Sequence, residues 1–149
     1  MKVIVLLVLI LVCLAFLTGG CGRGSKATVT LDELVANPQQ YHNKTVTVDG
    51  IYITGWESTI LANDVTFISS GSKKELTIVG NAIWFAGFMP LKIQEKLYQH
   101  TSPGAGLQHF GKVRVTGLFE YGGPYGYGNA YRYRINLEKA QWLEWTPPE

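Results

Sequence analysis

A stretch rich in glycine and tyrosine carries the side chains best suited to bind a ligand. It covers residues 121–134 and reads Tyr-Gly-Gly-Pro-Tyr-Gly-Tyr-Gly-Asn-Ala-Tyr-Arg-Tyr-Arg. Tyrosine rings stack on sugars or bases, and guanidinium groups pair with anions. We therefore expect Tyr125 and Tyr127 to offer a stacking surface, and Arg132 and Arg134 to meet anionic groups of a ligand. The alternative is that Tyr131 and Tyr133 pack into the barrel and that the glycines only allow a hairpin turn.

The histidines show no spacing typical of a metal site. His42, His100 and His109 lie far apart, and none has a second ligand residue at the i, i+4 spacing of a helical site. We predict no metal and no cofactor, and solvent-exposed loop positions for the three histidines.

The carboxylates also have simpler explanations than catalysis. Asp32 and Glu33 fit a helix cap, and Asp49 with Glu57 fits a strand surface. The sequence contains neither a Gly-x-Ser-x-Gly elbow nor a phosphate-binding glycine loop. We therefore predict no catalytic residues, and an enzyme ranks third among the functions considered.

Covalent chemistry is indicated at Cys21. It follows Leu-Thr-Gly-Gly at the end of an uncharged apolar run from Val3 to Leu17, with Lys2 ahead of the run. A charged start, an apolar stretch and small residues at the cut define a secretory signal peptide. The junction resembles the lipobox of bacterial lipoproteins, in which the thiol receives a diacylglycerol and the new amino terminus is acylated. Thr18 departs from that pattern, which usually has leucine there.

Two alternatives to a lipoprotein signal remain. An uncleaved membrane anchor needs about 18 apolar residues, and this run is shorter. Ordinary secretion without lipid is the other alternative. If the leader is cleaved, Cys13 leaves with it and Cys21 is the last cysteine, so the domain has no intramolecular disulfide and depends on its core for stability.

Charge and location together restrict the partners. Of 13 basic residues only Lys2 lies in the leader, which leaves 12 basic against 11 acidic residues in the mature chain. That balance gives no electrostatic argument for nucleic acid. We expect an extracytoplasmic protein of the cell envelope, held to a membrane through lipid at Cys21, with a glycan, a peptide or a protein as partner. Whether the outer or the cytoplasmic membrane holds it stays open.

The mature chain is predicted to be mainly β. Thr30 and Glu33 have the spacing of a capping box, which starts a short helix that ends before Pro38. Period-two alternation predicts a strand over residues 44–53, with a bend or bulge at Gly50. Further strands are expected over residues 58–62, 65–69, 112–121 and 130–137, with 75–79 as another candidate and 141–145 as an extension of the last. A tight turn at Asn63-Asp64 is expected to join the first two of these.

A helix is expected between the third and fourth strands. Pro90 suits a first helical turn, and Ile93, Leu97 and Tyr98 then share one face of an amphipathic helix of about ten residues. The apolar run over residues 83–89 ahead of it is expected to be buried and to close one end of a barrel; the alternative is an exposed patch for a partner.

Three strands, a helix and two strands are the element order of the OB-fold, a five-stranded barrel. Residues 37–41, 44–50 and 111–117 resemble small bacterial OB-fold lipoproteins of the tRNA anticodon-binding-like type. The resemblance implies the fold and not an activity. The expected organisation is a lipoprotein signal peptide over residues 1–20, a lipidated tether over 21–29, an OB-fold-like barrel over 30–145 and a tail over 146–149.

These expectations combine into a lipid-anchored envelope protein with an OB-like binding or interaction domain. The ligand is not specified by the sequence. The alternative function is a scaffold or assembly factor that acts through its surface without a small ligand.

Metabolic labelling with palmitate tests the lipid anchor. The full chain should incorporate the label, and Cys21→Ser should lose it, because only the cysteine thiol accepts the diacylglycerol. Label that persists in Cys21→Ser, or that is missing from the wild type, would contradict the lipobox.

Overall fold

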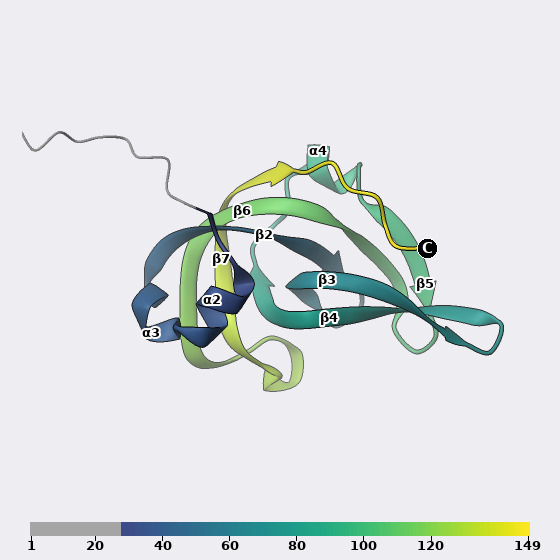
Figure 1. Cartoon of the computed structure of the whole chain (residues 1–149), viewed down its shortest axis with the longest axis horizontal. Coiled ribbons are helices and arrows are strands. Elements are labelled where there is room, and N and C mark those ends of the chain that lie inside the picture. Colours follow the sequence, from purple (N-terminus) through teal and green to yellow (C-terminus); the bar gives the residue numbers. More distant parts are fainter. Residues whose placement is uncertain (1–27) are drawn as a thin grey trace, which may run out of the picture.

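A computed structural model describes residues 28–149, so the predictions for the leader and for Cys21 lie outside the described residues. The elements, labelled in Figure 1 where there is room, are β1 (Thr28–Val29), α2 (Leu31–Ala36), α3 (Pro38–Tyr41), β2 (Lys44–Thr54), β3 (Thr59–Ser70), β4 (Lys73–Ala86), α4 (Leu91–Gln94), β5 (Tyr98–Ser102), β6 (Gly106–Tyr125), η1 (Tyr127–Asn129) and β7 (Tyr131–Trp142).

Five of the strands close into a barrel. They follow the order β2-β3-β4-β7-β6, and β6 pairs again with β2. All of these pairings are antiparallel except that of β4 with β7, which is parallel and runs from Trp84 opposite Arg134 to Ala86 opposite Asn136. This order, with α4 between β4 and β6, is that of the OB-fold. The predicted mainly β, OB-fold-like barrel is therefore confirmed.

The predicted capping box forms at the start of α2. The Glu33 N–H donates to the Thr30 hydroxyl at 3.0 Å, and the Thr30 N–H donates to the Glu33 carboxylate at 2.9 Å. The helix ends at Ala36, ahead of Pro38, and buries Leu31 and Leu34. Local sequence determined this element, because both halves of the cap lie within four residues.

Gly50 lies in an uninterrupted strand, so the predicted bulge is absent. The register of β2 with β6 runs without a shift from Lys44 opposite Phe119 to Thr54 opposite His109. A Cβ at Gly50 would lie 2.8 Å from the Ala62 carbonyl oxygen. The glycine is needed because β3 comes close to β2 here, one residue before their pairing begins.

The predicted turn at Asn63-Asp64 is wrong. β3 continues through both residues, and the register with β4 shifts between Ala62 and Asp64, as in a β-bulge. The Asn63 side chain accepts the Asn81 N–H at 2.7 Å, which replaces a ladder hydrogen bond across the bulge. The chain reverses later, at Gly71, whose φ of 63° suits a two-residue hairpin loop.

The predicted ten-residue helix is also wrong in length. α4 has four residues, and Tyr98 already belongs to β5, where it lies opposite Phe110 of β6. The Tyr98 ring contacts those of Phe110, Trp142 and Trp145, with centroid distances of 5.8, 6.4 and 6.0 Å. The local amphipathic pattern is compatible with a long helix and also with a short helix followed by a strand. The long-range contacts of Tyr98 favour the strand. Ile93 and Leu97 are buried as expected.

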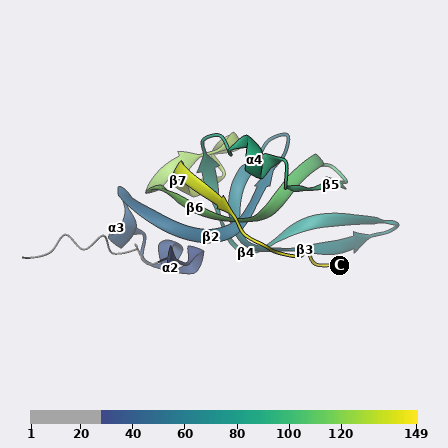
Figure 2. The ribbon, with the colours of Figure 1, turned by 90° about the horizontal axis from the view of Figure 1, so that it is seen from above.

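The apolar side chains form two cores on opposite faces of the sheet. The inner core lies inside the barrel and includes Val46, Val48, Leu61, Ile83, Phe85, Val113, Phe119 and Ile135. The outer core covers the opposite face and consists of Ile51, Ile53, Ile60, Ala62, Val65, Leu76 and Phe110. Figures 1 and 2 show the β3–β4 hairpin, which contributes to the outer core, extending away from the barrel on the side opposite α2 and α3.

Replacing Gly50 by alanine should destabilise the barrel. The new methyl group would need β3 to move, and such overpacking costs about 1–3 kcal/mol. Urea unfolding followed by circular dichroism measures the free energy of unfolding, with Ser69→Ala on the exposed part of the hairpin as the control. Equal stability of Gly50→Ala and wild type would show that the close approach is not required.

Candidate functional site

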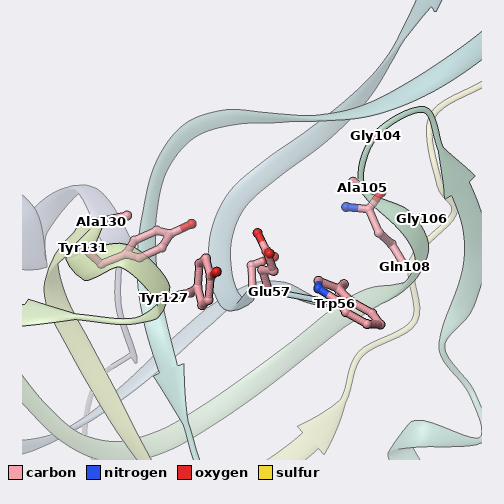
Figure 3. A pocket seen from close by; sticks show the side chains of 11 residues that line it. Trp56, Glu57, Gly104, Ala105, Gly106, Gln108, Tyr127, Ala130 and Tyr131 are labelled. Atoms are coloured by element: carbon pink, nitrogen blue, oxygen red, sulfur yellow. The ribbon is translucent and has the colours of Figure 1, made fainter.

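An open cleft lies on the outer face of the barrel, between three connections of the chain (Figure 3). Its volume is about 640 Å³. The lining residues belong to the β2–β3 connection (55–58), the β5–β6 turn with the start of β6 (104–106 and 108), and the β6–β7 connection with the start of β7 (127, 130 and 131). In OB-folds the connections that correspond to β2–β3 and β6–β7 border the ligand site.

Aromatic rings line both sides of the cleft. Trp56 is 90% exposed and Tyr127 is 65% exposed, although large aromatic side chains are usually covered. Tyr131 is half-buried and packs against Trp84 beneath it, with the ring centroids 5.8 Å apart. Figure 3 shows Tyr127 and Tyr131 on one side and Trp56 on the other. The cleft thus offers two accessible flat apolar surfaces and one fixed by packing.

The polar lining contains an acceptor and a positioned amide. The Glu57 carboxylate lies between Tyr127 and Trp56 and makes no hydrogen bond or ion pair with any residue of 28–149 (Figure 3). The Gln108 side chain is held by the buried Ser102, whose hydroxyl donates to the side-chain amide oxygen Oε1 of Gln108 at 2.6 Å. The same hydroxyl accepts the Leu76 N–H at 3.1 Å. The Gln108 NH₂ group is therefore left to face the cleft as a donor.

Of the four predicted ligand residues, the structure places only Tyr127 in the cleft. Arg134 Nε donates to the Glu120 carboxylate at 2.9 Å, and its guanidinium lies 4.5 Å from the centre of the Tyr125 ring. Arg132 is exposed on the face of β7 opposite Tyr131. No basic side chain lines the cleft, so the expected anion-binding pair is not part of it.

The ion pair of Glu120 and Arg134 is held by several groups. Burial alone would raise the pKa of Glu120, but hydrogen bonds from Arg134 and Asn136 and the nearby positive charge together hold its pKa below the ordinary value. Together with the Tyr125 ring, the pair fixes the end of β6 against β7. These contacts lie next to the β6–β7 connection that carries Tyr127.

Sequence reasoning missed Trp56 and Gln108 as site residues. The available signal was a tryptophan within the polar segment Gly55-Trp-Glu-Ser58, where burial is not expected. Gln108 carried no signal, because its position depends on Ser102 across a turn. Glu57 was interpreted as a strand-surface carboxylate near Asp49, but Asp49 pairs instead with Arg114 at 2.7 Å.

The predicted exposed loop positions are wrong for His100 and His109, which lie in β5 and β6, and all three histidines are partly buried. His42 Nδ1 accepts the Tyr121 N–H at 3.2 Å, and His100 Nε2 lies 2.9 Å from the Lys74 carbonyl oxygen. Within residues 28–149, no three histidine, cysteine or acidic side chains come together in a way that could hold a metal ion.

A second cavity of about 530 Å³ opens beside α4, and His109 is among its lining residues. The predicted burial of the apolar run 83–89 is confirmed for Ile83, Phe85 and Met89, which are at most 2% exposed, whereas the rest of the run is partly buried or exposed. Phe88 of this run is 96% exposed, and Leu91 at the start of α4 is 73% exposed. These two side chains border the second cavity.

Comparison with protein-family models, with curated proteins and with solved structures gave no match. Within the described part of the chain, no helix has both the length and the apolar character needed to cross a membrane.

The lowered pKa of Glu120 predicts a loss of stability in acid. A carboxylate whose pKa is lowered by folding stabilises the native state above its unfolded pKa, near 4.5, and loses this contribution as the pH falls through the folded pKa. The difference in free energy of unfolding between wild type and Glu120→Gln should therefore be constant above about pH 5 and shrink below it.

Urea unfolding at several pH values measures this difference, with Glu144→Gln on the exposed C-terminal segment as the control. A difference between wild type and Glu120→Gln that stayed constant down to pH 3 would contradict the ion pair.

Proposed function

We propose that this protein is a ligand-binding module of the cell envelope, and that its OB-like barrel binds a saccharide in the cleft between the β2–β3 and β6–β7 connections. The observation that carries the proposal is the pair of exposed rings, Trp56 and Tyr127, across an open cleft at the position of the OB-fold ligand site. A protein keeps such rings uncovered at a cost in hydration, which a ligand that stacks on them would offset.

The polar groups of the cleft support a saccharide over a purely apolar ligand. Hydroxyl groups need donors and acceptors around the ring, and Gln108, Glu57 and Ser58 supply both kinds. The glycines at 55, 104 and 106 line the cleft without side chains that would obstruct it, so an extended chain could pass across it. This combination of flat apolar surfaces with a few polar groups is typical of a specific small-molecule or oligomer site.

The location of the module is proposed from the sequence. The lipobox-like junction at Cys21 and the likeness of residues 37–41, 44–50 and 111–117 to small bacterial OB-fold lipoproteins support a lipid-anchored, extracytoplasmic protein. A binding module held at the membrane by a short tether would keep its ligand close to that surface.

The alternative function is a scaffold that binds a protein partner. The exposed pair Phe88 and Leu91 beside the second cavity favours it, because exposed apolar side chains that lie together often mark interaction surfaces. A scaffold would not need Trp56 and Tyr127 to face each other across a cleft, so substitutions in the cleft separate the two functions.

Substitutions of Trp56, Tyr127 and Tyr125 should separate ligand binding from stability. Full-length protein in detergent is tested on an array of bacterial cell-wall oligosaccharides, and the strongest binder is then titrated. Trp56→Ala and Tyr127→Ala should each weaken binding about tenfold, or ~1.4 kcal/mol, because each removes one stacking surface. Tyr125→Ala should lower the midpoint of thermal unfolding instead, since that ring packs on Arg134.

A loss of affinity in Tyr125→Ala as large as that in Tyr127→Ala would contradict the cleft as the site. Binding that is unchanged in both cleft variants would exclude a role for the exposed rings.

A further inference from the structure

We propose that the saccharide bound in the cleft carries a free, positively charged amino group, and that the Glu57 carboxylate receives it between the rings of Trp56 and Tyr127. This inference rests on the proposed function, because it names the ligand class of the same cleft. It specifies the charge of the ligand and the residue that recognises this charge.

The charge of the lining is the first argument. Glu57 is its one ionisable group apart from the tyrosines, and the lining contains no lysine, arginine or histidine. Within residues 28–149 the carboxylate has no ion pair, whereas Asp49 and Glu120 each pair with an arginine. The lining therefore carries one negative charge and no positive charge, which favours a cationic ligand over phosphates, carboxylated sugars and nucleic acid.

The placement of the carboxylate is the second argument. Figure 3 shows Glu57 in the middle of the cleft, with Tyr127 on one side and Trp56 on the other. The faces of tryptophan and tyrosine rings carry negative charge density and attract a cation within about 6 Å of the ring centre. An ammonium group next to Glu57 would gain an ion pair and contacts with aromatic faces from the same position.

The remaining groups favour a sugar as the carrier of that amine. The Tyr131 hydroxyl and the Gln108 NH₂ group face the cleft from opposite sides (Figure 3). Both can bond to hydroxyl groups on a ring that lies between them. A lysine side chain would use the carboxylate but would leave these two groups without partners, and unmet polar groups reduce affinity for the wrong ligand.

Two oligosaccharides that differ only in the amine test the proposal. The probes are the tetramer of glucosamine and the tetramer of N-acetylglucosamine, titrated by calorimetry into the full-length protein in detergent. At about pH 6 the free amines are protonated, and the acetylated tetramer is neutral. The glucosamine tetramer should bind about tenfold more tightly, and the preference should decrease with added salt, because exposed charges are screened.

Variants assign the preference to one carboxylate. Glu57→Gln should reduce the preference to within about twofold, because it keeps the shape of the side chain and removes its charge. Glu75→Gln changes an exposed carboxylate outside the cleft and is the matched control, so its preference should equal that of wild type. A tetramer of lysine is the third probe, and it should bind more weakly than the glucosamine tetramer.

Each contrary result has a separate meaning. Equal binding of both sugar tetramers, unchanged in Glu57→Gln, would overturn the amine and leave the proposed saccharide site intact. Tight binding of the lysine tetramer would show that the cleft recognises positive charge alone, and it would overturn the proposal that the ligand is an amino sugar. Binding of the acetylated tetramer that survives Trp56→Ala and Tyr127→Ala would instead contradict the proposed function.

Discussion

The fold depends on the pairing of β2 with β6, which closes the barrel. β2 pairs with β6 over its whole length and, from Ile51 onward, with β3 as well. A strand with two antiparallel neighbours inside a five-stranded barrel must coil, because closure tilts and twists every strand. Gly50 sits where the second neighbour arrives, and the backbone there has no room for a side chain. Barrel closure, the separation of the two cores and the position of the β2–β3 connection all follow from this double pairing.

The cleft results from that geometry and from the outer core. The β2–β3 and β6–β7 connections line the sides of the cleft and leave the barrel next to each other. This follows from the parallel pairing of β4 with β7, which brings the start of β7 beside the end of β4. Tyr131 rests on Trp84 through this pairing, and Ser102 reaches across from β5 to hold Gln108. The base of the cleft is therefore part of the packed protein. Trp56 and Tyr127 stand on connections above it and remain free to contact a ligand.

Features encoded within a few residues were predictable from the sequence. The capping box of α2 and the alternation in β2 are examples, since each needs only its own segment to be recognised. Asn63, Tyr98 and Arg134 were misassigned because their roles depend on distant partners. Asn63 completes a bulge against β4, Tyr98 packs on aromatic residues of β6 and the C-terminal segment, and Arg134 pairs with a carboxylate on β6. The sequence signals used for these residues were a turn propensity at Asn63, a helical periodicity at Tyr98 and the positive charge of Arg134. None of these signals indicates which distant residue the side chain will contact.

The exposure of Trp56 also gives the protein an internal optical reporter. The other three tryptophans, at 84, 142 and 145, are half-buried and pack on the cores, so their surroundings are already largely apolar. Trp56 alone stands almost fully in water, at the mouth of the cleft. An indole ring that moves from water into contact with another molecule shifts its emission to shorter wavelength. The fluorescence of the unlabelled chain therefore carries a component that responds to occupation of the cleft and is largely separate from the signals of the folded core.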